Sequence, residues 1–222
     1  MIYLLAYPRS GSSYIRYLLG FLTESKPMQP QGHCEMDYLL SQHYKNEPFI
    51  KKFHYPKDGN VNIIKDNNKL ALVQRNPIEN TLSFMFSNEM NGKKNHSDEF
   101  ISNYINDILS NKKNIFERYG NDYKNNLNFY RKWDNKKIII SYEEIIKSPE
   151  NELKRISQFF GYSNERVDLL MSDIEHHSSA VLSYKMQKND PFSVNTKGKV
   201  LDKFISMLSE DNKNYLNSFF NQ

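Results

Sequence analysis

Cysteine is almost absent from this chain, since Cys34 is the only one among 222 residues. A disulfide within the chain and a metal cluster built on cysteines are therefore excluded. This usage fits a reducing compartment, and we expect a cytoplasmic protein. Long apolar runs are also missing, so we expect no integral membrane segment and no signal peptide.

The chain also lacks a large excess of charge of either sign. The 30 Lys and Arg against 26 Asp and Glu leave a formal net charge of +4. The lysines come in short pairs, such as residues 51–52 and 93–94, and these are typical of solvated faces. A mild positive charge without a basic run suits a small anionic ligand, and we expect no nucleic-acid partner.

Glycine is sparse as well, with 8 in the chain, and this bears on the most informative segment. Residues 7–14 read Tyr-Pro-Arg-Ser-Gly-Ser-Ser-Tyr, with Gly11 as the only glycine and the cation Arg9 before it. A Walker A loop would need four residues between two glycines, followed by Lys and Ser or Thr. Residues 7–14 therefore do not form a Walker A loop.

The same segment nevertheless has the features of an anion site. It follows an apolar run at residues 2–6, predicted as a buried strand, and precedes a helical pattern at residues 13–22. A strand–loop–helix junction directs backbone N–H groups and the positive end of the helix dipole at one point. The serine hydroxyls and the charge of Arg9 add donors for a phosphate-like or sulfate-like anion. The alternative is an ordinary polar turn with a serine N-cap.

The rest of the chain alternates between strand and helix patterns. Strands are predicted at residues 2–6, 49–53, 70–74 and 137–141, and helices at 13–22, 78–87, 100–119, 122–132, 149–160 and 203–220. Continuous apolar strands separated by helices predict an α/β fold with a parallel sheet covered on both faces. Residues 27–48 and 178–199 show little periodicity and are expected to be loops. The length suits one domain with one substantial core.

Polar side chains follow three of the predicted strands. They are the loop with Arg9, the pair Lys52 and His54, and Arg75, which Ser83 follows eight residues later. Ligands of open parallel sheets bind at the carboxyl ends of the strands. We therefore expect these groups at one edge of the sheet. A second anion, such as a phosphate bound by both Arg75 and Ser83, would explain why these two residues come together.

Taken together, these segments resemble the sulfotransferases that use 3′-phosphoadenosine-5′-phosphosulfate (PAPS). Residues 7–14 are similar to the 5′-phosphosulfate loop of that family. Arg75 and Ser83 match its 3′-phosphate motif, an Arg followed eight residues later by a Ser. Residues 52–56 resemble its Lys-x-His segment, which holds the catalytic base of the cytosolic enzymes.

A fourth segment extends the resemblance. Residues 141–144 and 152–161 resemble the family's Tyr-Glu-[Asp/Glu] segment and the helix after it. Four motifs in the family's order span residues 3–161. The resemblance implies a P-loop-like three-layer sandwich with a central parallel sheet, and a single sulfotransferase-like domain over residues 1–222.

The activity implied is transfer of a sulfuryl group from PAPS to a hydroxyl or amine of a small-molecule or carbohydrate acceptor, without a metal. The product is 3′-phosphoadenosine-5′-phosphate (PAP). Catalytic roles are implied for Arg9 and Lys52 as cations and for His54 as general base, with Glu35 and Glu79 as rival bases. Cofactor contacts are implied for Arg9, Ser10, Gly11, Ser12, Ser13, Tyr14, Arg75, Ser83, Tyr142, Lys197 and Gly198.

The match weakens toward the C-terminus. Thr196 stands where the family's Arg-Lys-Gly loop has its Arg, and residues 201–203 replace the usual Gly-x-Trp. A non-catalytic relative that binds PAPS or PAP is therefore an alternative, and a small P-loop nucleotide kinase is another. The acceptor and the oligomeric state cannot be read from the sequence.

Overall fold

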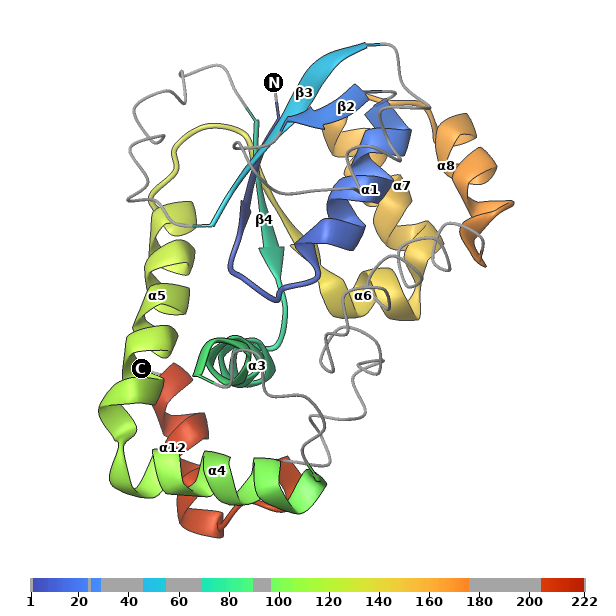
Figure 1. The fold of residues 1–222 in the computed structure, drawn as a ribbon. Helices are drawn as coiled ribbons and strands as arrows, with labels where there is room; N and C mark the ends of the chain where they lie inside the picture. The colour runs from blue at the N-terminus through green and yellow to red at the C-terminus, as the bar shows by residue number, and fades with distance from the viewer. Residues whose placement is uncertain are drawn as a thin grey trace. The chain divides into compact units, whose positions relative to one another are not determined.

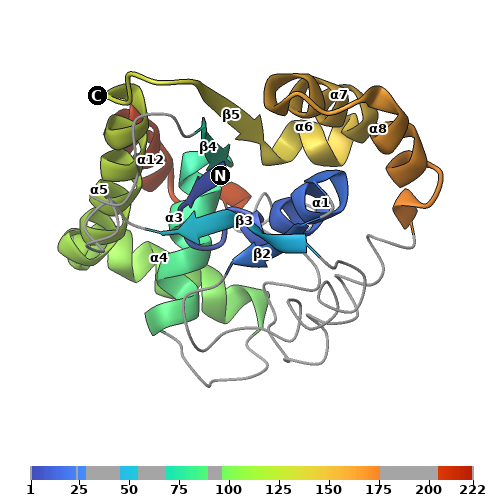
Figure 2. The ribbon, with the colours of Figure 1, turned by 90° about the horizontal axis from the view of Figure 1, so that it is seen from above.

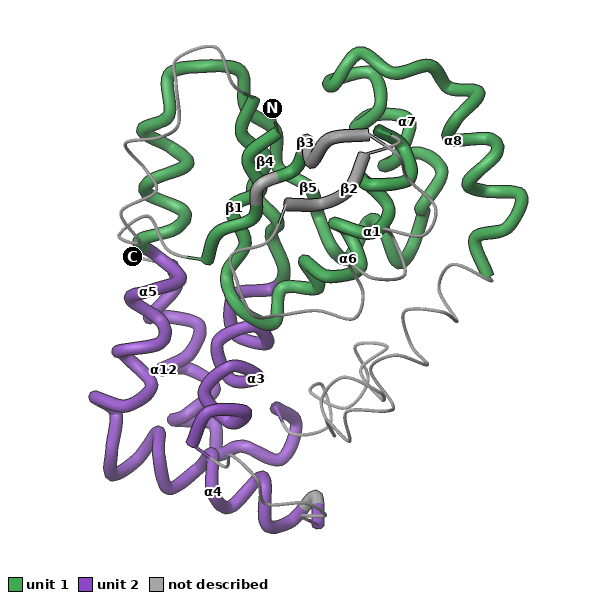
Figure 3. The backbone as a smooth tube through the Cα atoms, turned by 45° about the horizontal axis from the view of Figure 1, so that its top comes forward, with its two compact units in different colours: residues 1–75, 125–181 green, residues 76–124, 182–222 purple. Residues whose placement is uncertain are grey.

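A computed structural model describes residues 2–23, 25–28, 46–54, 69–89, 97–175 and 205–221 (Figure 1). The chain divides into two compact units, each made of two segments (Figure 3). One contains Met1–Arg75 and Asn125–Val181, and the other Asn76–Lys124 and Leu182–Gln222. We call them the sheet unit and the helical unit.

The sheet unit is built on a five-stranded sheet. Its strands are β1 (Ile2–Ala6), β2 (Ser25–Met28), β3 (Asn46–Phe53), β4 (Lys69–Gln74) and β5 (Lys137–Ser141). The strand order is β2-β3-β1-β4-β5, and every neighbouring pair is parallel. All of β1 is buried, as expected for a central strand. The loop after β1 therefore begins between the ends of β3 and β4.

Helices cover both faces of this sheet (Figure 2). One face carries α1 (Ser12–Thr23) and α7 (Pro149–Phe160), with α6 (Tyr142–Lys147) and α8 (Asn164–Met171) beside them. The other face carries the end of α5 (Lys113–Arg131), where Phe129 and Tyr130 pack in a cluster with Tyr3 and Leu5 of β1. The predicted three-layer α/β fold with a central parallel sheet is confirmed.

The helical unit has a core of its own. It contains α3 (Pro77–Glu89), α4 (Asp98–Asn111), the first part of α5, and α12 (Glu210–Phe220). The buried members of its core are Leu82, Met85, Phe86, Ile101, Ile105, Ile108, Leu109, Phe116, Tyr119, Leu208 and Leu216. Across both units, no helix in the described residues is long and apolar enough to cross a membrane.

Several predictions about elements were wrong: α5 runs without a break through residues 120–121, and the helix predicted over residues 203–220 is α12, which begins at Glu210. The helix expected over residues 100–119 is two helices, because α4 ends at Asn111 and Lys112 leaves the helical conformation with φ −136°. The break allows both helices to bury apolar residues in one core, which is a tertiary effect that periodicity does not show. Residues 27–48 were expected to be loops, but the end of β2 and the start of β3 fall within them.

Candidate functional site

The loop between β1 and α1 is a tight turn that leads directly into a helix. The Ser10 N–H donates to the Tyr7 carbonyl at 3.2 Å, and the Gly11 carbonyl accepts from the N–H of Tyr14 at 3.0 Å. The helix begins at Ser12. Because the first N–H groups of a helix have no partner within it, they are directed at the space beside this loop.

The backbone of this loop is in an unusual conformation. Arg9 has φ +68° and Gly11 has φ +81°, and Arg9 is the only residue besides glycine with positive φ in the described part of the chain. The left-handed region costs a residue with a Cβ about 1–2 kcal/mol. Left-handed residues next to right-handed ones turn successive N–H groups into a concave anion-binding nest. The strain at Arg9 therefore points to a function of the loop.

Ser10 is fully buried, at 0% exposure. Its Oγ has no hydrogen-bond partner among the residues that the structure describes. A buried hydroxyl without a partner costs about 1–3 kcal/mol, and such groups call for an explanation when they occur. Together with the neighbouring hydroxyls of Ser12 and Ser13, it fits a ligand that carries anionic oxygens.

Two side chains from other strand ends close around the loop. Arg75, one residue after β4, is 6% exposed, and its Nη1 donates to the Arg9 carbonyl at 3.2 Å. Its guanidinium lies 5.2 Å from the ring centroid of Tyr142. That ring lies so close to Gly11 that a Cβ there would overlap it. The structure thus brings together three predicted groups: the loop, Arg75 and Tyr142.

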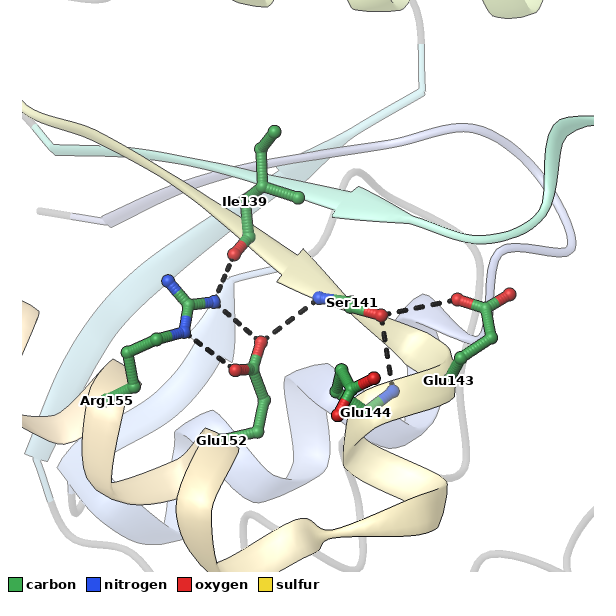
Figure 4. A network of polar contacts seen from close by, with 6 residues as sticks. All are labelled: Ile139, Ser141, Glu143, Glu144, Glu152 and Arg155. Carbon is green, nitrogen blue, oxygen red and sulfur yellow. Dashed lines mark hydrogen bonds and ion pairs between the residues drawn. The ribbon is translucent and has the colours of Figure 1, made fainter.

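Tyr142 is the first residue of α6, and hydrogen bonds around Ser141 hold the junction between β5 and this helix (Figure 4). Glu152 accepts from the Ser141 N–H at 3.1 Å, and Arg155 pairs with Glu152 at 2.6 Å and also donates to the Ile139 carbonyl. The Ser141 hydroxyl caps α6 by accepting from the Glu144 N–H at 3.2 Å. The end of β5 and the start of α6 are therefore both anchored on either side of Tyr142.

His54 lies directly after β3. Its Nδ1 is 2.7 Å from the carbonyl oxygen of Ala6, the last residue of β1. A carbonyl only accepts hydrogen bonds, so Nδ1 carries the proton and Nε2 has the lone pair in the neutral ring. The carbonyl of His54 itself accepts from Asn126 Nδ2 of α5 at 2.7 Å.

The surroundings of His54 keep the ring uncharged. Burial lowers the pKa of His54 from its ordinary 6.5 to about 4, with a further decrease from the charge of Lys52. The hydrogen bond to Ala6 acts in the opposite direction, and the charge of Arg16 adds a smaller decrease. At neutral pH the imidazole is therefore a proton acceptor.

Arg16 was not predicted as a site residue. It lies in α1, four residues after Ser12 and hence on the same face of the helix, and it is 3% exposed. A buried guanidinium is rare. In the sequence, only the position of Arg16 one turn after the loop indicated that it could lie near the site.

The other predicted residues belong to the helical unit or lie outside the described residues. Ser83 is buried in α3 and Glu79 is half-buried there, and both belong to the helical unit. Arg75 belongs to the sheet unit, so its pairing with Ser83 stays a prediction. Outside the described residues are Glu35, Thr196, Lys197 and Gly198.

Solved structures with this fold include two that are complexed with PAP. Mouse sulfotransferase SULT7A1 complexed with PAP is 17% identical, with a TM-score of 0.57 over 99% of this chain and 81% of that chain. Retinol dehydratase in complex with androsterone and the inactive cofactor PAP is 13% identical, with a TM-score of 0.56 over 99% and 79%. At such identities, the likeness shows the fold.

The sequence itself gives the family. No curated protein matches it. The family model of the sulfotransferase domain, however, matches residues 1–222. The family match covers the whole sequence, so the chain, with its parallel sheet and a strand–loop–helix junction after the central strand, belongs to the sulfotransferase domain family.

Proposed function

We propose that this protein transfers a sulfuryl group from PAPS to a hydroxyl or amine of a small-molecule or carbohydrate acceptor. The observation that carries the proposal is the loop after β1, where the buried Ser10 Oγ has no partner among the described residues and lies between the left-handed Arg9 and Gly11. Membership of the sulfotransferase domain family supports it. When bound, PAPS would supply the sulfuryl group, with PAP as the leaving group.

The loop holds the 5′-phosphosulfate. Ser10, Ser12 and Ser13 donate from their hydroxyls, and Gly11 has no side chain of its own to keep an anion away from the backbone. Arg9 adds a fixed positive charge beside the anion. An anion bound in the loop would also give the buried Ser10 hydroxyl a hydrogen-bond acceptor. Hydrogen bonds to anionic oxygens are about twice as strong as those between neutral groups.

The 3′-phosphate is held by Arg75 and Ser83. A guanidinium binds phosphate oxygens in a bidentate manner, and Arg75 is already oriented by the Arg9 carbonyl and the Tyr142 ring. Tyr142 and Tyr14 provide aromatic surface for the adenine. Lys197 and Gly198 complete the cofactor contacts.

His54 is the general base. Its Nδ1 proton is held by the Ala6 carbonyl, so Nε2 takes the proton of the acceptor hydroxyl. The low pKa keeps this nitrogen unprotonated at neutral pH. An anion bound near Lys52 offsets the positive charge around the ring, and this raises its basicity when the donor is in place.

Lys52 and Arg9 stabilise the negative charge that develops during transfer. Lys52 is half-buried on β3, and the register pairs it with Leu4 of the central strand.

We also propose that the sheet unit and the helical unit form one sulfotransferase domain. The family match over residues 1–222 supports this, since it covers both.

The test is turnover on a panel of phenols, alcohols, amines and sugars, followed through release of PAP from PAPS. We expect His54→Ala to lower kcat about 10²–10⁴-fold while the Kd for PAP changes little. Unchanged turnover would remove His54 from the mechanism. Binding of PAP by the wild-type protein without turnover on any acceptor would favour the non-catalytic alternative.

A further inference from the structure

Asn126 is a buried amide next to the end of β3. It is 2% exposed, and its Nδ2 donates to the His54 carbonyl at 2.7 Å. Its Oδ1 is also buried and has no hydrogen-bond partner among the described residues. The reversed amide would set two acceptor oxygens against each other, so the bond to His54 fixes its orientation.

Two hydrogen bonds with described residues restrain His54. The register between β1 and β3 ends with the pair of Leu5 and Phe53, so His54 is the first residue beyond the ladder. The Ala6 carbonyl holds its ring, and Asn126 holds its backbone carbonyl. These two bonds come from different elements and restrain opposite ends of the residue.

The segment of α5 that carries Asn126 is itself well anchored. Phe129 packs edge-on against Phe53, with ring centroids 6.4 Å apart. Leu127 and Tyr130 pack in the same cluster as Tyr3 of β1. The amide therefore stands on a fixed part of the helix, on the face turned to the strands.

Within the described residues, the Oδ1 atom of Asn126 makes no hydrogen bond that would stabilise the fold. A buried oxygen without a partner lowers stability, whereas an apolar side chain of similar size would avoid that cost. Proteins retain such unfavourable groups chiefly where a function depends on them. What the amide adds here is the hydrogen bond from Nδ2 to the His54 carbonyl, which an apolar side chain would not make.

We propose that Asn126 is a positioning residue, which holds the His54 backbone so that the ring keeps Nδ1 on the Ala6 carbonyl and Nε2 as its proton acceptor. The catalytic part of this proposal rests on the proposed role of His54 as base. A residue that only fills space would affect thermal stability, while a positioning residue also determines the tautomer and titration of the ring.

The experiment compares Asn126→Leu with the wild-type chain, and Asn126→Ala is the second variant in case the first does not fold. The matched control is Asn212→Leu, since Asn212 is another buried amide, bonded to Asn106 in the helical unit. The readouts are the tautomer and titration of His54 by ¹⁵N NMR, the Kd for PAP, and kcat.

In the Asn126 variants, we expect both tautomers of His54 and a pKa that moves up toward its ordinary value, because the ring gains access to water. We expect kcat to fall about 10-fold, with PAP affinity within about twofold of wild type. The control keeps a single tautomer and wild-type kcat. An unchanged tautomer and titration in the Asn126 variants would overturn the proposal.

The proposal that His54 is the base and the proposal that Asn126 positions it are contradicted by different results. Full turnover by His54→Gln would exclude His54 as the base. The NMR comparison needs no acceptor and no turnover, so it still decides whether Asn126 holds the ring.

Discussion

Arg9 combines a strained backbone with a charge at the position where both are needed. Its φ of +68° suits glycine, which has no Cβ, yet a glycine would lose the guanidinium. We expect Arg9→Gly to be about 1 kcal/mol more stable than Arg9→Ala, because only the alanine keeps the strain. Both variants should lose affinity for PAP to a similar extent.

Thermal melts of the two variants and calorimetry with PAP give these values. The alanine variant is the control, because it removes the same charge and leaves the strain in place. Equal stability of the two would mean that the left-handed conformation of Arg9 carries no strain.

His54 links stability to pH. Its pKa is about 4 in the folded chain, lowered chiefly by burial, against 6.5 in the unfolded chain. Between these values the unfolded chain binds more protons, so the free energy of unfolding falls as pH falls from about 6.5 toward 4. From pH 7 to pH 5 the loss amounts to about 2 kcal/mol from this residue.

Urea denaturation at the two pH values tests the linkage. His54→Gln has no ring to titrate, so its loss of stability on acidification should be smaller by about that amount. An equal loss in both proteins would show that His54 is not held uncharged by the fold.

Which of these residues the sequence could reveal depends on where they lie. His54 and Arg75 follow strands directly and Arg9 lies three residues after β1, and the rule for parallel sheets places such residues at one edge. Asn126 had no comparable signal. Residues 125, 126 and 128 are all Asn, and only the contact with His54 distinguishes one of them.

At the scale of elements, the close approach of α6 to the loop makes Gly11 hard to replace. A Cβ at Gly11 would overlap the Tyr142 ring, in addition to the strain of φ +81°. Gly161, the C-cap of α7, has nearly the same φ of +84° but nothing within 4 Å of its Cβ position. We expect Gly161→Ala to cost about 1 kcal/mol and Gly11→Ala clearly more.

The comparison separates strain from overlap, and thermal melts measure both. The double variant Gly11→Ala with Tyr142→Ala should recover part of the difference, because the overlap with the ring is removed. Equal costs at the two glycines would show that the ring does not press on the loop.

The outer edge of β5 is protected by α7. β5 is the last strand of the sheet order, and Arg155 and Glu152 bind its outward Ile139 carbonyl and Ser141 N–H in place of a further strand (Figure 4). Exposed strand edges invite pairing between chains. Arg155 is half exposed but Glu152 is buried, so Arg155→Met leaves a buried carboxylate without its charge partner. We expect the variant to lose about 1–3 kcal/mol and to associate more readily.

Sedimentation over a range of concentrations tests the association. Lys154→Met is the matched control, since Lys154 lies on the same helix and pairs with Glu150 in solvent. A monomeric Arg155→Met at all concentrations would contradict the protective role.

Elements with a strong local pattern were predicted well. The bounds of β1, β5 and α7 agree with prediction, because apolar runs and the Gly161 cap mark their ends. The four residues of β2 carry no such pattern and were missed. Short elements like this depend on pairing with a neighbouring strand, which no local signal reveals.

At the scale of the whole molecule, the chain was predicted to be one domain, and this stays a prediction. Each compact unit is made of two separate segments, and α5 runs from one unit into the other. Neither unit is therefore a continuous piece of chain. The acceptor could not be predicted, because its recognition depends on how loops come together in space.

The central claim is that this chain binds the PAPS nucleotide through the loop after β1 and Arg75. Calorimetric titration with PAP, and with adenosine-5′-phosphate as the control, tests it most directly. We predict micromolar or tighter binding of PAP that requires the 3′-phosphate and is lost in Arg75→Ala. Absence of binding to either nucleotide, or equal binding of both, would contradict the account.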